Sequence, residues 1–312
     1  MERSARWTAV AGALTTLALC PATGWSDTFV QATVPDPATA IASGPWREPD
    51  GRRLPFTGAV EVETFLREAE VVSTEPIPQG ITEPLKLLLQ RDGVRAHAIF
   101  RRHHDVDRGV RLDDGTRLKF FVDSYKGDVA AYRLSRLLGM HNVPPTVVRR
   151  VRRTLGSVQL WVEGSRTQAS VLREAGAMPS ELLARRGLQI WEMRVFDNLI
   201  DNIDRNPGNM LWSETWDLWL VDHTRTFARS TELPSSDRIH RCSRRLYDSL
   251  PKLDEESVGR ELDGLFGRFE IQALLVRRDL ILQRLRRLID ERGEAAVLFD
   301  LAAAPPPSAN RP

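Results

Sequence analysis

Residues 191–227 constrain the fold more than any other stretch, because they hold three closely spaced side chains that can bind a metal ion. A long apolar helix pattern runs to Ile200 and gives way to a polar turn, Asp-Asn-Ile-Asp-Arg-Asn-Pro-Gly-Asn. Asp204 and Asn209 stand five residues apart in this turn, and Asp222 ends the Trp-rich strand pattern that follows. Their oxygens are ligands of the kind that Mg2+ and Mn2+ prefer. Because Asp, Asn, Pro and Gly also form ordinary turns, the interpretation depends on the rest of the chain.

Residues 1–24 have the pattern of a secretory signal peptide. Two arginines precede an apolar run over residues 7–20, which is too short to span a bilayer, and small residues follow. Cleavage is expected near Ala22 or Gly24, and the protein is expected to be periplasmic or secreted. The bulky Leu19 stands where a lipoprotein cleavage box needs a small residue, which argues against lipidation. No later run is apolar enough to predict a transmembrane segment.

The composition is that of a globular protein, with 42% hydrophobic and 28% charged residues and a net charge of +2. This balance gives no reason to expect nucleic acid or an anionic membrane as a partner. After signal-peptide removal Cys242 is the only cysteine, so no intrachain disulfide is possible. Basic residues are mostly arginine, and lysine is confined to Lys86, Lys119, Lys126 and Lys252.

Residues 25–57 are rich in Pro, Ala, Thr and Gly, which predicts a linker or strap, and folded structure is expected from Gly58. A helix pattern over residues 60–70 precedes two alternating strands that meet at an Asp-Gly turn, a hairpin signal. The loop with Gly80 and Thr82 leads into this hairpin, where its backbone N–H groups could cover phosphates or form an ordinary turn. Arg101 follows Phe100 in the alternating strand, so its side chain is expected on the opposite face of the sheet. Its cation could reach a nucleotide there.

A polar run beginning at His103 is interpreted as a solvated loop rather than a metal cluster. Residues 127–138 form a helix pattern with Asp128 in its first turn and Gly139 placed to end it. Two further strands, at residues 143–148 and 157–162, are expected around a Leu-Gly turn at 155 and 156. They complete a small antiparallel-sheet N-terminal lobe over residues 58–163. Trp161 and Glu163 then lie at the lobe boundary, where they either frame a nucleotide base or, for Trp161, pack in the core.

Residues 164–301 predict a mostly helical C-terminal lobe, with helices at 235–250, 255–269 and 270–291. The arginine clusters in these helices, Arg277 included, are interpreted as solvated helix faces rather than a patch for acidic substrates. Residues 302–312 contain a proline run and are expected to be a disordered tail.

Several segments resemble the secretory-pathway kinase family typified by the Golgi casein kinase. Residues 127–145 resemble its helix and Val-Pro-Pro strand, and residues 196–205 resemble its catalytic segment. The Leu-Val-Asp222 strand end resembles its metal-binding aspartate, and residues 80–89 with Phe100 and Arg101 resemble its nucleotide loop and lysine strand. The likeness extends in the same order over most of residues 80–227. More distantly, the Asp-Arg-Asn-Pro-Gly-Asn turn is similar to that of HipA-type and phosphatidylinositol kinases.

The resemblance implies an α+β, two-lobed protein-kinase-like fold that transfers the γ-phosphoryl group of ATP or another nucleoside triphosphate to a hydroxyl of a protein, glycan or lipid. It implies Asp204 as base, Asn209 and Asp222 as ligands of Mn2+ or Mg2+, and Asp128 as the helix acid facing the nucleotide cation. The physical chemistry agrees, because a carboxylate beside the acceptor hydroxyl orients it and takes its proton.

The family carries lysine where Arg101 stands and glutamate where Asp128 stands. Lys119 is therefore a second candidate for the phosphate contact. Two other functions remain open beside the kinase: a nucleotide-binding pseudokinase or scaffold, and a transferase of AMP. Scarce ATP outside the cytoplasm favours the pseudokinase, whereas the intact Asp204 and Asp222 favour the kinase.

Overall fold

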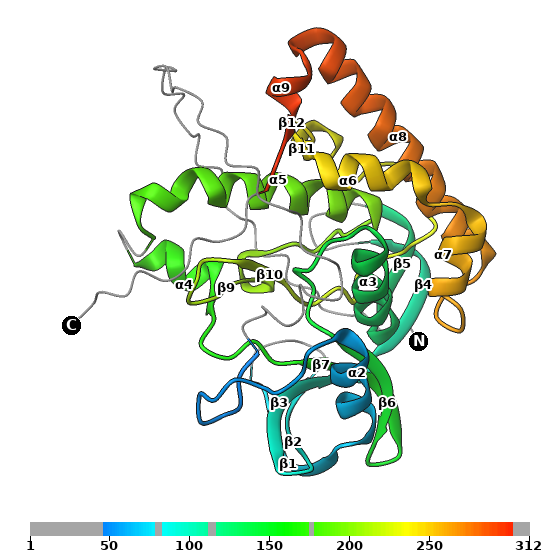
Figure 1. Ribbon diagram of the computed structural model, residues 1–312. Helices are drawn as coiled ribbons and strands as arrows, with labels where there is room; N and C mark the ends of the chain where they lie inside the picture. The colour runs from blue at the N-terminus through cyan, green and yellow to red at the C-terminus, as the bar shows by residue number, and fades with distance from the viewer. Residues whose placement is uncertain (1–45, 79–82, 112–116, 175–177, 302–312) are drawn as a thin grey trace.

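The computed structural model describes residues 46–78, 83–111, 117–174 and 178–301 (Figure 1). The predicted signal peptide, the loop residues Gly80 and Thr82, and the predicted tail lie outside these ranges. Trp46 and Leu54 are buried in the N-terminal core, so the expectation that folded structure begins at Gly58 is wrong. The Leu54 amide donates a 3.1 Å hydrogen bond to the Trp46 carbonyl, which holds the two ends of this segment together.

The N-terminal lobe is an antiparallel sheet with one helix packed on it, drawn at the bottom of Figure 1. Within the described residues the sheet has five strands in the order β1-β2-β3-β7-β6. Its elements are α2 (Ala59–Glu68), β1 (Glu70–Pro76), β2 (Leu85–Arg91), β3 (Val94–Arg101), β6 (Thr146–Val151) and β7 (Thr154–Leu160).

The predicted hairpin is confirmed as β2 and β3, joined at Asp92 and Gly93, which both adopt positive φ angles (51° and 79°). Two consecutive left-handed residues give a turn whose twist matches that of the paired strands. Alternate β3 residues, including Ala98 and Phe100, enter the core beneath α2. Arg101 therefore emerges on the opposite face of the sheet, as the alternation predicts.

The turn between β6 and β7 lies at Arg152 and Arg153, with φ of 46° and 71°, and not at the predicted Leu-Gly pair. Arginine is an unusual residue for this conformation, so composition misplaces the turn. Gly156 lies inside β7 for a different reason. A Cβ at this position would stand 2.2 Å from the carbonyl oxygen of Arg101, so glycine lets the two strand backbones approach.

The polar run after His103 is a strand and not the predicted solvated loop. β4 (His104–Arg111) pairs antiparallel with β5 (Arg117–Ser124) as a two-stranded ribbon. The His104 ring makes a 2.7 Å hydrogen bond to Ser124 Oγ, so this histidine connects the two strands where the ribbon begins. The ribbon delivers the chain directly to the next helix.

Helix α3 (Tyr125–Leu137) begins at Ser124, whose side chain accepts the Lys126 amide, and ends before Gly139, whose φ is 69°. Its first turn packs against the segment that follows β10, and the Ser124 amide donates to the Thr224 carbonyl (2.8 Å). Gly127 makes this approach possible, because a Cβ there would lie 2.1 Å from the backbone oxygen of His223.

Gly127→Ala should therefore destabilise the protein by about 1–3 kcal/mol or more, because the His223 carbonyl belongs to packed backbone and has little room to move. Denaturant unfolding measures the change. Gly187→Ala in another helix is the matched control, since nothing lies within 4 Å of its added Cβ, and it should be neutral or stabilising by up to about 1 kcal/mol. Equal effects of the two substitutions would contradict the close packing of α3 on residue 223.

The C-terminal lobe is mostly helical, as predicted, with a small sheet in the order β10-β9-β8 that is drawn below α5 in Figure 1. The main elements are α4 (Gln168–Arg173), α5 (Leu183–Leu199), α6 (Arg244–Ser249), α7 (Glu255–Glu261), α8 (Arg268–Arg292) and α9 (Glu294–Val297). The strands are β8 (Arg166–Thr167), β9 (Met210–Trp212), β10 (Leu218–Leu220), β11 (Cys242–Ser243) and β12 (Leu298–Phe299), and short 3-10 turns are η1 (Ser180–Leu182), η2 (Pro207–Asn209), η3 (Ser236–Arg238) and η4 (Leu250–Lys252).

Three predictions for this lobe are wrong. The helix expected at 255–269 ends as α7 at Glu261, and residues 262–267 are a turn before α8 begins. Residues 235–250 hold η3, β11 and α6 instead of one helix. Arg277 is not on a solvated helix face: it is fully buried, and its guanidinium donates to the Leu199 and Ala228 carbonyls at 2.9 and 3.3 Å. A buried guanidinium is tolerated where carbonyl oxygens accept its hydrogen bonds. Here these hydrogen bonds join the end of α5 to the segment after β10.

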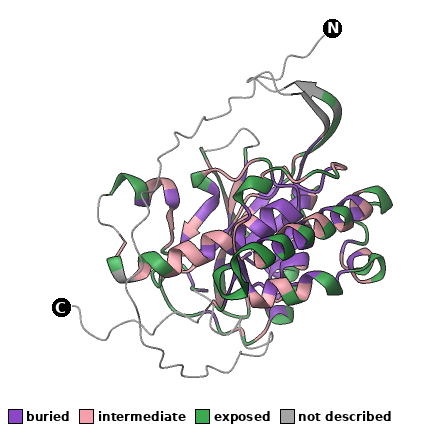
Figure 2. Ribbon diagram, turned by 90° about the horizontal axis from the view of Figure 1, so that it is seen from above, coloured by how far each residue is buried: buried purple, intermediate pink, exposed green. Residues whose placement is uncertain are grey.

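The buried residues form two hydrophobic clusters, one in the N-terminal sheet and one in the C-terminal lobe. In Figure 2 they gather in the centre of the molecule, with the outer faces of the helices exposed. Most buried apolar side chains of α3, such as Val129 and Leu134, belong to the C-terminal cluster. Across the described ranges, no helix combines the length and hydrophobicity needed to cross a membrane.

Candidate active site

Three residues that are distant in sequence form an ion-paired centre between the lobes. Arg101, the last residue of β3, reaches Asp128 in α3, with 3.4 Å between Nη1 and Oδ2. Its Nε lies 3.5 Å from Oδ1 of Asp222, which follows β10. Arg101 and Asp128 are buried, whereas 38% of the Asp222 side chain is exposed. The Arg101 cation is therefore fixed by the buried carboxylate of Asp128 and faces the solvent-accessible carboxylate of Asp222.

Asp128 is held in place by three donors. Besides Arg101, the Ser157 hydroxyl donates to Oδ2 (3.0 Å) and the His223 amide donates to Oδ1 (2.8 Å). Burial raises the pKa of Asp128, and Arg101 opposes that shift by favouring the charged form. Since both oxygens are engaged by donors, Asp128 has the surroundings of an ion-pair partner that orients Arg101.

Asp222 has a left-handed backbone conformation, with φ of 58°. Aspartate is one of the few residue types that adopt it readily, and such conformations cluster at functional sites. The conformation lies at the point where the chain leaves β10, and Thr224 Oγ1 lies 3.4 Å from Asp222 Oδ1.

The turn containing Asp204 and Asn209 is closed by its own side chains. Asn206 Oδ1 accepts the Gly208 amide (2.8 Å), and Asn209 Nδ2 donates to the Asp204 carbonyl (3.0 Å). This bond turns the amide nitrogen of Asn209 inward, which leaves its Oδ1 as the atom suited to a cation. The Asp204 carboxylate makes a 3.1 Å ion pair with Arg225.

Burial raises the pKa of Asp204, and the Arg225 cation acts in the opposite direction. The charge of Asp222 also raises this pKa, so the two aspartates are close enough to interact electrostatically. A raised pKa suits a carboxylate that must accept a proton during a reaction.

Arg205 connects the Asp204 turn to the Asp222 segment, a role that sequence reasoning missed. Its guanidinium pairs with Asp197 (2.8 Å) and donates to the carbonyls of Asn209 and Val221, each at 2.9 Å. It also lies 2.9 Å from Nε2 of His223, whose pKa is held well below its ordinary value by burial and by two arginines. A neutral His223 thus accepts from Arg205.

The donor set fits a divalent cation that is shared with a nucleotide. Asp222 and Asn209 offer oxygen ligands, but among the described residues no cluster of three or more His, Cys, Asp or Glu could hold an ion alone. Mg2+ and Mn2+ commonly bind through one or two protein oxygens, with phosphate oxygens and water completing the shell. The site therefore fits a metal–nucleotide complex better than a metal ion by itself.

The remaining predicted site residues are only partly placed. Trp161 and Glu163 follow β7 at the lobe boundary, where the Lys86 ammonium lies 4.9 Å from the Trp161 ring centroid and Glu163 Oε1 pairs with His97 Nδ1 at 2.5 Å. Trp161 is half-buried and absent from both core clusters. Lys119 lies in β5, but its side chain, like Gly80 and Thr82, is outside the described part of the structure.

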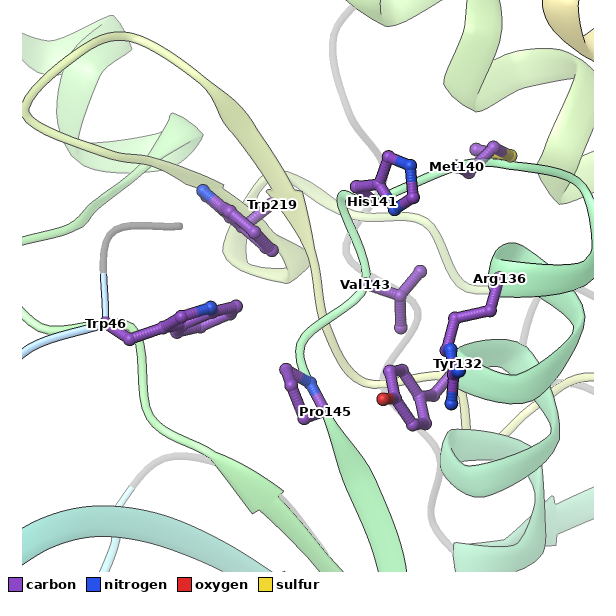
Figure 3. Close-up of a pocket in the computed structure, with 8 residues that line it drawn as sticks. All are labelled: Trp46, Tyr132, Arg136, Met140, His141, Val143, Pro145 and Trp219. Atoms are coloured by element: carbon purple, nitrogen blue, oxygen red, sulfur yellow. The ribbon is translucent and has the colours of Figure 1, made fainter. Parts of the chain in front are cut away.

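A pocket in the structure is lined by a different set of residues (Figure 3). Trp46 and Trp219 face each other on one side, with 4.6 Å between ring centroids, and α3 supplies Tyr132 and Arg136 on the other. Burial and two nearby arginines lower the pKa of its His141 to about 4, so this ring is neutral at physiological pH. None of the candidate site residues lines the pocket.

No protein-family model and no curated protein sequence matches the chain. Solved structures do. Hydra Fam20 with sugar matches with a TM-score of 0.58 at 15% identity, over 78% of this chain and 92% of that chain. The Golgi casein kinase matches with a TM-score of 0.56 at 14% identity, over 77% and 78% of the two chains, and its complex with Mn and ADP matches with 0.55 at 14% identity, over 80% of each.

The chain has the Golgi casein kinase fold. The family resemblance inferred from the sequence is thereby confirmed at the level of the fold, including the two-lobed α+β architecture. In this kinase fold, β3, α3 and the segment after β10 converge on Arg101, Asp128 and Asp222. The sequence identities are low, so the likeness carries the fold, and function has to be argued from the site.

Proposed function

We propose that this protein is an exported atypical kinase. It would transfer the γ-phosphoryl group of ATP or another nucleoside triphosphate to a hydroxyl of a protein, glycan or lipid, with Mn2+ or Mg2+. The observation that carries the proposal is the convergence of Arg101, Asp128 and Asp222 beside the Asp204 turn in a kinase fold. The Mn and ADP present in the Golgi casein kinase complex support the choice of ligands. Export rests on the sequence pattern of residues 1–24.

Each residue has a role that its surroundings support. Asp222 and Asn209 would hold a divalent ion, which when bound offsets the negative charge of the phosphates. Arg101, kept in place by Asp128, would contact phosphate oxygens. Asp204 would orient the acceptor hydroxyl and accept its proton, for which its half-buried, pKa-raised carboxylate is suited.

One observation favours a second function, nucleotide binding without turnover. Arg101 lies against Asp222, so in this structure the expected metal ligand is paired with a cation. An arginine makes directional contacts that lysine does not, and it could hold a nucleotide without aligning it for transfer. The alternative needs Arg101 to remain on Asp222 when nucleotide and metal bind.

Label transfer tests the proposal against both alternatives. The protein expressed without residues 1–24 is incubated with ATP labelled at the α or the γ phosphate, Mn2+ or Mg2+, and candidate acceptors including water. The kinase predicts transfer of γ label only. Transfer of α label would indicate AMP transfer, and nucleotide binding with no transfer of either label would support the pseudokinase.

The choice between Arg101 and Lys119 is a prediction of its own. Arg101→Met should weaken binding of ADP with Mn2+ by about ten- to hundredfold, the scale of a lost charge-assisted hydrogen bond, whereas Lys119→Met should leave it nearly unchanged. Arg101→Lys, which restores the residue type of the family, should bind nearly as the parent does. Calorimetric titration of folded variants measures the affinities. The reverse order of the two Met variants would assign the phosphate contact to Lys119.

A further inference from the structure

The backbone and the carboxylate of Asp204 are fixed by different neighbours. Its amide donates to Asn202 Oδ1 (3.0 Å), and its carbonyl accepts from Asn209 Nδ2 (3.0 Å). These bonds set the turn but leave the direction of the carboxylate open. That direction is set by Arg225, whose Nη1 lies 3.1 Å from Oδ2, and more weakly by Asn206 Nδ2, 3.3 Å from Oδ1.

Arg225 is itself anchored from the other side. Its Nε lies 3.1 Å from Oδ2 of Asp123, a residue of β5 that is 1% exposed, and its guanidinium lies 5.8 Å from the Phe121 ring centroid. Its own carbonyl accepts the Ile203 amide (3.4 Å), so its main chain lies against the residue before Asp204. One end of the guanidinium is thus held by a buried carboxylate, and the other end is presented to Asp204.

We propose that Arg225 is the positioning residue for the base of this kinase, and that Asp123 orients it. The inference rests on the proposed function, since it assigns Asp204 the role of base. Arg225 lies in the segment after Asp222 and connects it to β5 and to the Asp204 turn. Of these, β5 leads directly into α3. The geometry needs a side chain that reaches two carboxylates in different directions at once.

Arginine meets that need and lysine does not. The planar guanidinium presents Nε and Nη1 as separate donors in a fixed fork, whereas a lysine ammonium is a single centre on a flexible stem. Arg225→Lys would therefore keep the positive charge but lose the bridge from Asp123 to Asp204. This difference separates positioning from a general electrostatic effect.

The test measures kcat and the nucleotide KM for four variants beside the parent. Arg225→Gln should lower kcat by about ten- to hundredfold, the scale expected when a reacting group is misplaced by about 1 Å, with the nucleotide KM changed by less than about twofold. Asp123→Asn should give the same pattern, and Arg225→Lys should fall between the parent and the Gln variant. Arg229→Gln is the matched control, because Arg229 is ion-paired in the same segment, with Glu270 at 2.6 Å, and should keep the parent kcat.

Three results would overturn the inference. Full activity in Arg225→Gln would remove Arg225 from the reaction, and full activity in Arg225→Lys would reduce its role to charge. A parallel loss of nucleotide affinity and melting temperature would indicate a structural role only. In all three cases the parent still transfers phosphate and the proposed kinase stands. If the parent itself transfers no γ label, the proposed function fails and this inference falls with it.

Discussion

Asp204→Asn is expected to slow phosphoryl transfer strongly while leaving nucleotide binding intact. The amide keeps the volume of the carboxylate and the backbone bonds of the turn, but it cannot accept the proton of the acceptor hydroxyl. Transfer should fall by about two or more orders of magnitude, the scale of a lost general base. Rates at saturating nucleotide, measured with the melting temperature in ADP and Mn2+, separate the two effects.

The pH dependence of the parent gives the same prediction a second check. Burial raises the pKa of Asp204, and the base must be deprotonated to act. The rate should therefore fall as pH decreases, with a midpoint above the ordinary pKa of an aspartate. Asp237→Asn, at an exposed position, is the control and should leave rate and profile unchanged. If Asp204→Asn transfers phosphate at the parent rate, Asp204 is a turn residue and the assignment of the base is wrong.

Asp222→Ala should abolish the stabilisation that nucleotide and metal give together. A ligand at about 100 times its Kd raises the free energy of unfolding by about 2.7 kcal/mol, or several degrees in melting temperature for a chain of this size. Without the carboxylate the ion loses its charged protein ligand, so ATP with Mn2+ should produce little or no rise.

The control for Asp222→Ala is the melting temperature without ligand. Asp222 is partly exposed, and Arg101 keeps Asp128 as a partner, so the unliganded variant should remain folded. Asp217→Ala removes another partly exposed, ion-paired aspartate and should keep the full ligand-dependent rise. An undiminished rise in Asp222→Ala would take Asp222 out of the metal site.

Periodicity and order along the chain predict the frame of the site. The alternation of β3 places Arg101 opposite the core, the helix signals place Asp128 in the first turn of α3, and strand spacing places Asp222 after β10. These are local patterns, and local patterns are what a single sequence carries. The fold follows from their order and is confirmed by the match to the Golgi casein kinase.

What the sequence does not predict depends on long-range contacts. Arg277 falls on the buried stripe of α8, three residues after Leu274, but its charge predicts a solvated position. Its burial depends on backbone carbonyls far away in sequence, which accept its hydrogen bonds. Asp123 and Arg225 have no distinctive local pattern and gain a role only because β5 and the Asp222 segment meet. The turn at Arg152 was missed because its conformation is adopted against the preference of its residue type.

We expect Asp222 and Asn209 to hold a metal ion on the nucleotide beside Arg101. Anomalous diffraction from crystals grown with Mn2+ and ADP measures this directly. We expect a manganese peak about 2–2.6 Å from a carboxylate oxygen of Asp222 and from Oδ1 of Asn209, with Arg101 turned from Asp222 to phosphate. Bound ADP with no manganese at Asp222, and with Arg101 still paired with that residue, would show that Asp222 is not a metal ligand.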